Sequence, residues 1–317
     1  MRLGHEACFG CSLCLLACPV WQATRDVRLT PRGRAKALQH GATLEELVDS
    51  IDSCTLCGSC EPACPQEMAL PAMVMDMRAE LGRRYPDRIA PGQEPSTRQG
   101  AQPGSSTAAA VLIPGRALCA DESLTERILR LLAPPGRVSL AADGGTDIVR
   151  SLESGASISE ERIERFLAPL RRAKRLVVGD GLLFRALRDW LPGARPRSLG
   201  EALSFVPAVR KALRSEDMYV IESRAYHADR ERLVKYYDAL RASFGGHMNL
   251  DLQRLAIPTT AGGLPAALGR NRVDVLAQAR WILEGRTFSR IVVESPDDIA
   301  AFAAVSDKPV VHLAQLA

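Results

Sequence analysis

Two stretches near the start of the chain decide its interpretation: CFGCSLCLLACP at residues 8–19 and CTLCGSCEPACP at residues 54–65. Both have the spacing C-x2-C-x2-C-x3-C-P, and together they contain eight of the nine cysteines in the 317-residue sequence. Three thiolates spaced in this way can surround one face of a four-iron cubane, and the run is a ligand pattern for [4Fe–4S] clusters. The spacing therefore predicts a metal-binding, redox-active segment that holds two [4Fe–4S] clusters.

The fourth cysteine of each run is expected to serve the other run's cluster. It lies too far along the chain to close the same cubane easily, and the proline behind it turns the chain away. In ferredoxins that carry two clusters, the fourth cysteine of one run ligates the cluster held by the other run. The predicted ligands are Cys8, Cys11, Cys14 and Cys64 for the first cluster, and Cys54, Cys57, Cys60 and Cys18 for the second.

Other uses of clustered cysteines fit this pattern less well. Structural zinc sites favour paired C-x2-4-C knuckles separated by a longer loop, rather than four cysteines within eleven residues. A disulfide framework belongs to an oxidising compartment, and nothing in the sequence indicates export. Radical chemistry uses an isolated three-cysteine motif, whereas each run here has four cysteines and the run is duplicated. We therefore expect [4Fe–4S] clusters rather than zinc or disulfides.

The bulk composition is that of a globular protein. The chain is 46% hydrophobic and 25% charged, and its length suggests two or three domains. Its net charge of +4 is small for this length and predicts no nucleic-acid partner. No stretch has the ~20 apolar residues of a membrane-spanning helix, and the N-terminus lacks an apolar export segment. We expect a cytoplasmic protein that reaches the inner face of a membrane, if at all, by docking to a partner.

The segment between the two cysteine runs predicts helices. Thr30 is a good N-cap, Pro31 suits the first helical position, and Gly41 ends the segment. Thr43 and Glu46 then form a capping-box pattern, which opens a second helix that leads to the second cysteine run. The apolar face expected for that helix consists of Leu44, Leu47, Val48 and Ile51.

Three regions follow from the changes in composition along the chain. Residues 1–86, with a third helix after Pro71, are expected to form an α-helical ferredoxin domain; the methionines of that helix, Met73 and Met77, are interpreted as core filling. Residues 87–108 are rich in Pro, Gly, Ser and Gln and predict a flexible linker. Residues 109–317 alternate short apolar strands with amphipathic helices, which indicates an α/β domain with parallel strands. The predicted fold class is α+β multidomain.

The α/β region contains an internal echo. VLIPG at 111 and LVVGD at 176 resemble YVIES at 219 and IVVES at 291, which predicts two related half-repeats, approximately 109–215 and 216–317. The predicted strands are Ala110–Ile113, Val138–Ala141, Leu176–Val178, Tyr219–Ile221, Ile291–Val293 and Val310–His312. Helices are predicted around 123–133, 160–172, 182–191, 229–243, 272–284 and 297–305.

The order of the motifs carries a resemblance to a known family. With two cysteine runs and the stretch T-P-R-G-R from Thr30 to Arg34 between them, residues 1–86 resemble the iron–sulfur subunits that serve flavin dehydrogenases and heterodisulfide reductases. The glycolate oxidase iron–sulfur subunit, the small subunit of anaerobic glycerol-3-phosphate dehydrogenase and lactate-utilisation proteins are of this kind. The resemblance implies an electron-transfer subunit. Its implied partners are a flavin-containing dehydrogenase, other redox subunits, or a membrane-bound quinone-linked subunit.

The second half resembles the same family but lacks its ligands. That family usually continues with two cysteine-rich (CCG) repeats, whose cysteines in heterodisulfide reductases hold clusters that cleave a disulfide. At the corresponding positions this chain has Gly115-Arg116, Asp143-Gly144-Gly145, Ala261-Gly262-Gly263 and Pro296-Asp297-Asp298. Cys119 is the only cysteine beyond residue 64 and is interpreted as a small buried residue. We therefore expect a degenerate repeat domain without a catalytic site of its own, used for docking.

The arginines of the T-P-R-G-R stretch leave two interpretations open. Arg32 and Arg34 flank Gly33 at a predicted helix start, where they would offset the negative charge of the clusters or contact a partner subunit. The alternative is a solvated helix face.

The favoured function is electron transfer through two [4Fe–4S] clusters, between a flavin-containing or disulfide-reductase-type partner and another acceptor. The alternative is an adaptor or interaction subunit whose clusters are mainly structural. A reductase with its own catalytic site in residues 109–317 is disfavoured, because the cysteines that such a site would need are missing.

Overall fold

The structure, a computed structural model, describes residues 4–88, 110–132, 138–267 and 269–317. Contacts between residues divide the chain into two compact units. The first unit joins residues 1–91 with 150–157 and 249–285, and the second joins 92–149, 158–248 and 286–317. Each unit is therefore assembled from separated segments, whereas the predicted domains follow the chain in order. The predicted linker at 87–108 lies outside the described residues, except for Asp87 and Arg88.

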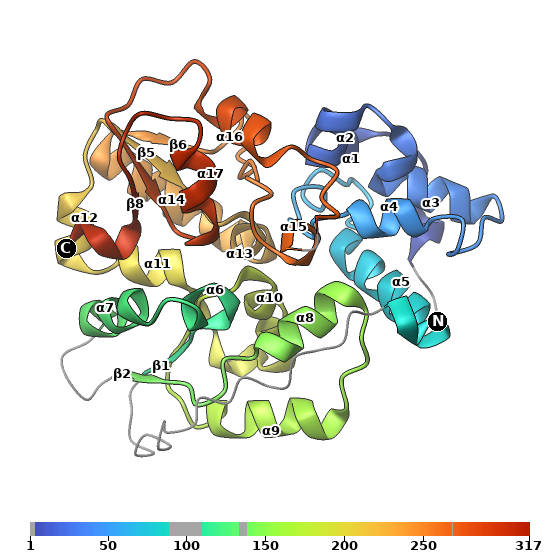
Figure 1. Cartoon of the computed structure of the whole chain (residues 1–317), viewed down its shortest axis with the longest axis horizontal. Helices are drawn as coiled ribbons and strands as arrows, with labels where there is room; N and C mark the ends of the chain where they lie inside the picture. The colour runs from blue at the N-terminus through green and yellow to red at the C-terminus, as the bar shows by residue number, and fades with distance from the viewer. Residues whose placement is uncertain (1–3, 89–109, 133–137, 268) are drawn as a thin grey trace. The chain divides into compact units, whose positions relative to one another are not determined.

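The part of the first unit that carries the cysteines is built from helices. They are η1 (His5–Ala7), α1 (Leu13–Leu16), α2 (Pro19–Thr24), η2 (Val27–Leu29), α3 (Pro31–Gln39), α4 (Val48–Ser53) and α5 (Leu70–Arg84) (Figure 1). The later segments of this unit add α15 (Leu264–Ala267) and α16 (Val275–Leu283).

The predicted caps between the cysteine runs are present. The Thr30 hydroxyl accepts a hydrogen bond of 3.1 Å from the Gly33 N–H at the start of α3, and Pro31 occupies the first turn. The capping box is also formed, because the Glu46 N–H donates to the Thr43 hydroxyl at 3.3 Å and the Thr43 N–H donates to the Glu46 carboxylate at 2.8 Å. The helix that follows is shorter than predicted, since residues 44–47 form turns before α4 begins at Val48.

The core of the first unit includes the helix predicted after Pro71. Helix α5 has Pro71 in its first turn, and Met73 and Met77 are buried, which confirms their interpretation as core residues. A late segment of the chain also joins this core, because Val273 packs with Cys18 and Val20. The last cysteine of the first run is therefore supported by a residue more than two hundred positions away.

The second unit contains two four-stranded parallel sheets. The first has the order β2-β1-β3-β4, with β1 (Ala110–Ile113), β2 (Val138–Leu140), β3 (Leu176–Val178) and β4 (Arg197–Ser198). The second has the order β6-β5-β7-β8, with β5 (Asp217–Val220), β6 (His247–Met248), β7 (Arg290–Val293) and β8 (Val310–His312). The two sheets thus have the same strand order, as expected of related half-repeats, and a mixed α and β fold with parallel sheets is observed.

The six predicted strands are all present, with small shifts at their ends. Two strands were missed, β4 and β6, and each has only two residues. Such short strands follow polar loops and have no apolar run of their own, so periodicity does not reveal them. Both are edge strands, and each pairs with a single neighbour: β4 with β3, and β6 with β5.

Helices connect the strands of the second unit. They include α6 (Gly115–Cys119), α7 (Glu122–Leu132), α9 (Glu160–Leu170), α10 (Gly181–Trp190), α11 (Leu199–Ser204), α12 (Pro207–Ala212), α13 (Ser223–Ala228), α14 (Arg230–Phe244) and α17 (Asp297–Ala303). Helix α10 packs closely against α13, because a Cβ atom on Gly181 would lie 2.6 Å from the Cβ atom of Arg224. This contact joins the two half-repeats inside the second unit.

Candidate metal centre

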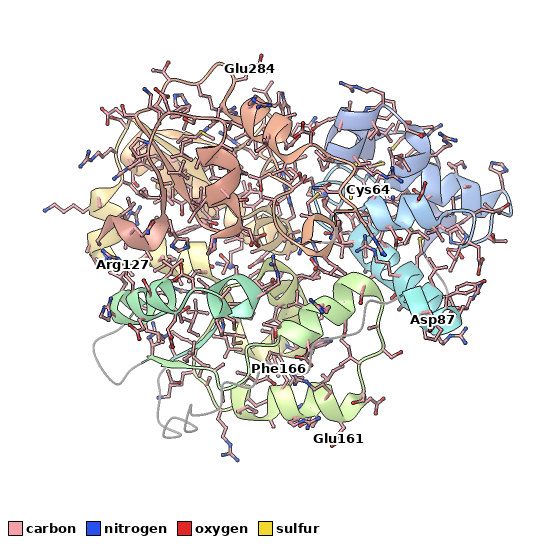
Figure 2. The ribbon with its side chains drawn as sticks, in the orientation of Figure 1. Cys64, Asp87, Arg127, Glu161, Phe166 and Glu284 are labelled. Carbon is pink, nitrogen blue, oxygen red and sulfur yellow. The ribbon has the colours of Figure 1, made fainter. Side chains whose placement is uncertain are left out.

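The eight cysteines of the two runs line two cavities in the first unit. Cys8, Cys11, Cys14 and Cys64 line one cavity, and Cys18, Cys54, Cys57 and Cys60 line the other. Each cavity therefore receives three cysteines from one run and the fourth cysteine of the other run, which is the grouping expected for an exchange of fourth ligands. We call these two cavities, in that order, the first and second cysteine cavities. Cys64, which lines the first, is labelled in Figure 2.

The two cavities are adjacent, because they share part of their lining. Pro31 and Leu70 line both of them, so these two side chains stand between the cysteine groups. Two groups bound there would be separated by little more than one layer of side chains.

Electrostatics reproduce the same grouping. The pKa of the Cys14 thiol is raised to about 11, mainly by burial and in smaller part by the neighbouring Cys8, Cys11 and Cys64. Burial likewise raises the pKa of Cys18 to about 12, with Cys57 and Cys54 adding to the effect. Without a bound cation these thiols keep their protons at neutral pH. Iron would have to displace the protons, since metals bind the thiolate form of cysteine.

The donor set fits a cubane. Four thiols line each cavity, the number and kind of ligand that a [4Fe–4S] cluster takes. Polar hydrogens also point at the sulfur atoms. The backbone N–H of Arg32 donates to Cys14, that of Trp21 donates to Cys18, and the N–H of Ser59 donates to Cys57. Such hydrogen bonds to ligand sulfurs tune the potential of an iron–sulfur cluster.

The T-P-R-G-R stretch places the N-terminus of α3 between the cavities. Arg32 lines the first cavity, and its Nε–H donates to the Gly10 carbonyl at 3.1 Å. Gly33 has no room for a side chain, because a Cβ atom there would lie 1.9 Å from the carbonyl oxygen of Val27. This close approach brings α3 against η2, and it explains why glycine stands between the two arginines.

Arg34 lines the second cavity and is only 1% exposed. Its Nη1 donates to the carbonyl oxygens of Leu29 and Ser50 at 3.0 and 2.7 Å. Its buried Nε has no hydrogen-bond partner in the described part of the chain. Contact with a partner subunit and a solvated helix face are both ruled out for Arg34 by this burial. The remaining interpretation is that Arg34 places a positive charge beside the cysteines of the second cavity.

Two further residues fix the cysteine runs and were not identified from the sequence. The Arg78 guanidinium is 4% exposed and donates to the carbonyl oxygens of Ile51, Cys54 and Glu153 at 2.9, 2.6 and 2.8 Å. Gln39 Nε2 donates to the carbonyl oxygens of His5 and Cys8 at 2.7 and 2.8 Å. Arg78 thus holds the start of the second run, and Gln39 holds the start of the first.

The sequence contained a signal for Arg78. It lies four residues after Val74 and three before Leu81, so it shares a helix face with two buried apolar residues. A charged residue on an apolar face needs internal partners, because burial of an unpaired charge is costly. Gln39 offered no comparable signal, since glutamine is common at the end of an exposed helix.

Comparison with known proteins agrees with this site. Residues 4–68 match the protein family described as a 4Fe-4S dicluster domain. The segment is an iron–sulfur domain, and the match supports [4Fe–4S] cluster binding and an electron-transfer role. No curated protein sequence and no solved structure gives a significant match to the chain. Among the described helices, none is long and apolar enough to cross a lipid bilayer.

The positions where cysteines were missing in the second unit form other contacts. Arg116, which stands where the resembling family has a cysteine, forms an ion pair of 2.9 Å with Asp297, the residue before the position of another such cysteine, Asp298. Asp143 of the D-G-G stretch pairs with Arg162 at 2.8 Å. Cys119 lies beside Gly144 but is half-buried rather than buried.

Proposed function

We propose that this protein is an electron-transfer subunit of a multisubunit oxidoreductase, with two [4Fe–4S] clusters that relay single electrons. The observation that carries the proposal is the pair of adjacent cavities, each lined by four cysteines drawn from both runs. The clusters would supply one-electron redox chemistry. The electrons would pass between a flavin-containing or disulfide-reductase-type partner and another acceptor.

The chain's own residues would hold the clusters, exclude water and adjust their potentials. Buried apolar side chains of Leu70 and Leu56 line the cavities and limit the access of water. Backbone N–H groups donate to the ligand sulfurs and favour the more negative, reduced state. Arg34 acts in the same direction through its charge.

The second unit would serve the complex by binding a partner rather than by catalysis. Where the resembling family has cysteines, this unit has residues that offer no thiolate ligand: Arg116, Asp143, Gly144 and Asp298. Its two parallel sheets have buried apolar strands that give a core without metal.

The proposal is tested by anaerobic purification followed by iron, sulfide and zinc analysis. We expect about eight iron and eight labile sulfide per chain, from two cubanes. Electron paramagnetic resonance of the reduced protein should show two interacting [4Fe–4S]⁺ spins. Cys119→Ser serves as the matched control and should leave the iron content unchanged. Stoichiometric zinc without labile sulfide would overturn the proposal, and clusters that cannot be reduced would favour the structural alternative.

A further inference from the structure

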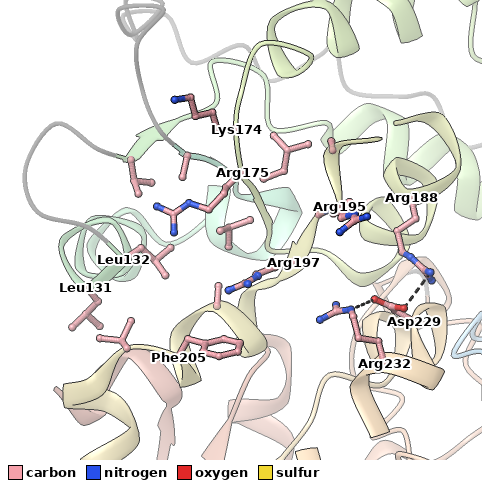
Figure 3. Close-up of a pocket in the computed structure, with 18 of the residues that line it drawn as sticks. Leu131, Leu132, Lys174, Arg175, Arg188, Arg195, Arg197, Phe205, Asp229 and Arg232 are labelled. Atoms are coloured by element: carbon pink, nitrogen blue, oxygen red, sulfur yellow. Dashed lines mark hydrogen bonds and ion pairs between the residues drawn. The ribbon is translucent and has the colours of Figure 1, made fainter. Parts of the chain in front are cut away.

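A wide cavity of the second unit is strongly basic. It encloses about 1270 Å³, and seven cationic side chains but only one carboxylate, that of Asp229, line it (Figure 3). Three of the cations, Lys174, Arg175 and Arg195, form no ion pair within the described ranges. Like charges gathered in one concave surface raise the local potential and attract a negatively charged ligand.

Parallel strands explain how these cations come together. Lys174 and Arg175 directly precede β3, and Arg195 and Arg197 lead into β4. The first residues of β1 and β2 also line the cavity. Because the four strands are parallel, all of them begin at the same edge of the sheet, so the basic residues that precede them meet there. Small ligands of open α/β sheets usually bind at the opposite, carboxyl edge.

Three of the other cations, Arg188, Arg197 and Arg232, have ion-pair partners, and the buried Glu201 carboxylate pairs with both Arg197 and Arg232. Asp229 accepts from Arg232 at 2.6 Å and pairs with Arg188 at 3.1 Å, as the dashed lines in Figure 3 show. The Arg197 guanidinium lies 4.8 Å from the centre of the Phe205 ring, which is 45% exposed. The cavity therefore offers a wide array of positive charge beside an exposed aromatic ring.

We propose that this cavity binds an acidic polypeptide segment of a partner protein, one that carries Asp or Glu residues with an apolar residue among them. The cavity is larger than the ~300–1,000 Å³ of typical small-molecule pockets. Six of its seven cations are exposed, and they are spread along the sheet edge rather than convergent on one point. Helices α7 and α10 end at the cavity, and where α14 begins beside it, the N-cap residue Asp229 places a carboxylate that disfavours a bound phosphate.

The inference deepens the proposed function, and it rests on that function only for the identity of the partner as a redox protein. Binding itself is measured without electron transfer. If the protein carries its clusters but does not bind the peptide, only the proposed peptide site is refuted. If it binds the peptide but carries no clusters, only the proposed function is refuted.

The test uses the full chain and a fluorescein-labelled twelve-residue peptide with the sequence Glu-Asp-Glu-Leu three times over. Fluorescence anisotropy should show saturable binding that weakens as salt rises, and a peptide with Gln and Asn in place of Glu and Asp should bind at least tenfold more weakly. Arg175→Glu with Arg195→Glu should weaken binding at least tenfold. The control pair Arg165→Glu with Lys308→Glu makes the same change in net charge away from the cavity and should alter binding less than twofold.

Two results would overturn the proposal. One is equal weakening by the cavity pair and the control pair, which would mean nonspecific attraction. The other is stoichiometric binding of ATP with no binding of the acidic peptide, which would assign the cavity to a nucleotide. If the glutamate pair fails to fold by circular dichroism, Arg175→Gln with Arg195→Gln replaces it, with an expected loss of at least threefold.

Discussion

The two cysteine cavities are built from the same motif but differ in their distance from solvent. In the first cavity Cys11 is exposed, and the neighbouring Phe9 and Leu16 side chains are 60% and 61% exposed. In the second cavity Cys18 and Cys57 are buried. The second run lies between α4 and α5, and Arg78 holds its start by donating to the carbonyl oxygens of Ile51 and Cys54.

This difference shows which properties the motif determines and which it leaves to its surroundings. The spacing of the cysteines sets the ligand chemistry of both cavities equally. Burial and nearby charge are set by the rest of the fold, and they control solvent access and potential. The exposed first cavity is suited to electron exchange with a partner. The second cavity is shielded, and Arg34 offsets part of the cost of placing negative charge there.

The largest expected effect comes from the exchanged cysteines. Cys18→Ser should damage the second cluster and Cys64→Ser the first, because each side chain lines the cavity of the other run. Each variant should retain about four iron and keep the spectrum of the intact cluster. Iron analysis and electron paramagnetic resonance of both variants check this. An assignment without exchange predicts the reverse pattern, with each variant losing the cluster of its own run.

The second-largest effects are expected from the two residues that anchor the cysteine runs, Arg78 and Gln39. Arg78→Met leaves the buried carbonyl oxygens of Ile51, Cys54 and Glu153 without a donor, which costs about 3 kcal/mol or more. Gln39→Leu should loosen the first run with a smaller loss of stability. Urea unfolding and the rate of iron release to a chelator measure both effects.

The matched control for Arg78 is Arg83→Met, because Arg83 pairs with Glu80 at the surface of the same helix. It should change neither unfolding nor iron release noticeably. We expect Arg78→Met to speed the loss of iron from the second cluster more than from the first. Equal rates of loss from the two clusters would contradict this prediction.

Exposure to air should distinguish the cavities without any mutation. Oxidants reach a solvent-exposed thiolate-ligated group more easily than a buried one, and Cys11 is exposed while Cys57 is buried. We therefore expect the first cluster to be lost several times faster. The decay of the two spectroscopic signals over time measures this, with Cys64→Ser used to identify the signal of the first. Equal rates would mean that solvent access does not limit oxidation.

Much of the fold could be predicted because local signals agreed with the tertiary structure. The Thr30 cap, the Thr43–Glu46 box and the strands Leu176–Val178 and Val310–His312 depend on nearest neighbours, which the sequence displays directly. The cysteine spacing likewise predicted which cysteines line each cavity. The assignment of ligands to clusters stays a prediction until iron is bound.

The missed features depend on contacts between distant segments. Arg78 reaches Glu153, and Val273 packs on Cys18, so no window of sequence contains both partners. Glu294 is a further case: the hydroxyls of Tyr219 and Tyr237 donate to its buried carboxylate at 2.7 and 2.6 Å, and burial raises its pKa to about 7. A Glu that follows an apolar strand reads as the start of a loop, so its burial becomes visible only in three dimensions.

The smallest expected effect, and the finest test of the comparison, concerns Arg34. Arg34→Met removes a buried positive charge beside the second cavity, so the reduced state of that cluster loses stabilisation and its potential should fall. A change on the order of 1 kcal/mol corresponds to about 40 mV for one electron. Arg34→Lys keeps the charge and should restore most of the difference.

Redox titration followed by electron paramagnetic resonance measures both potentials. The potential of the first cluster should shift less, because Arg34 lines only the second cavity. Equal shifts of the two potentials would show that Arg34 acts through the fold of α3 rather than through its charge.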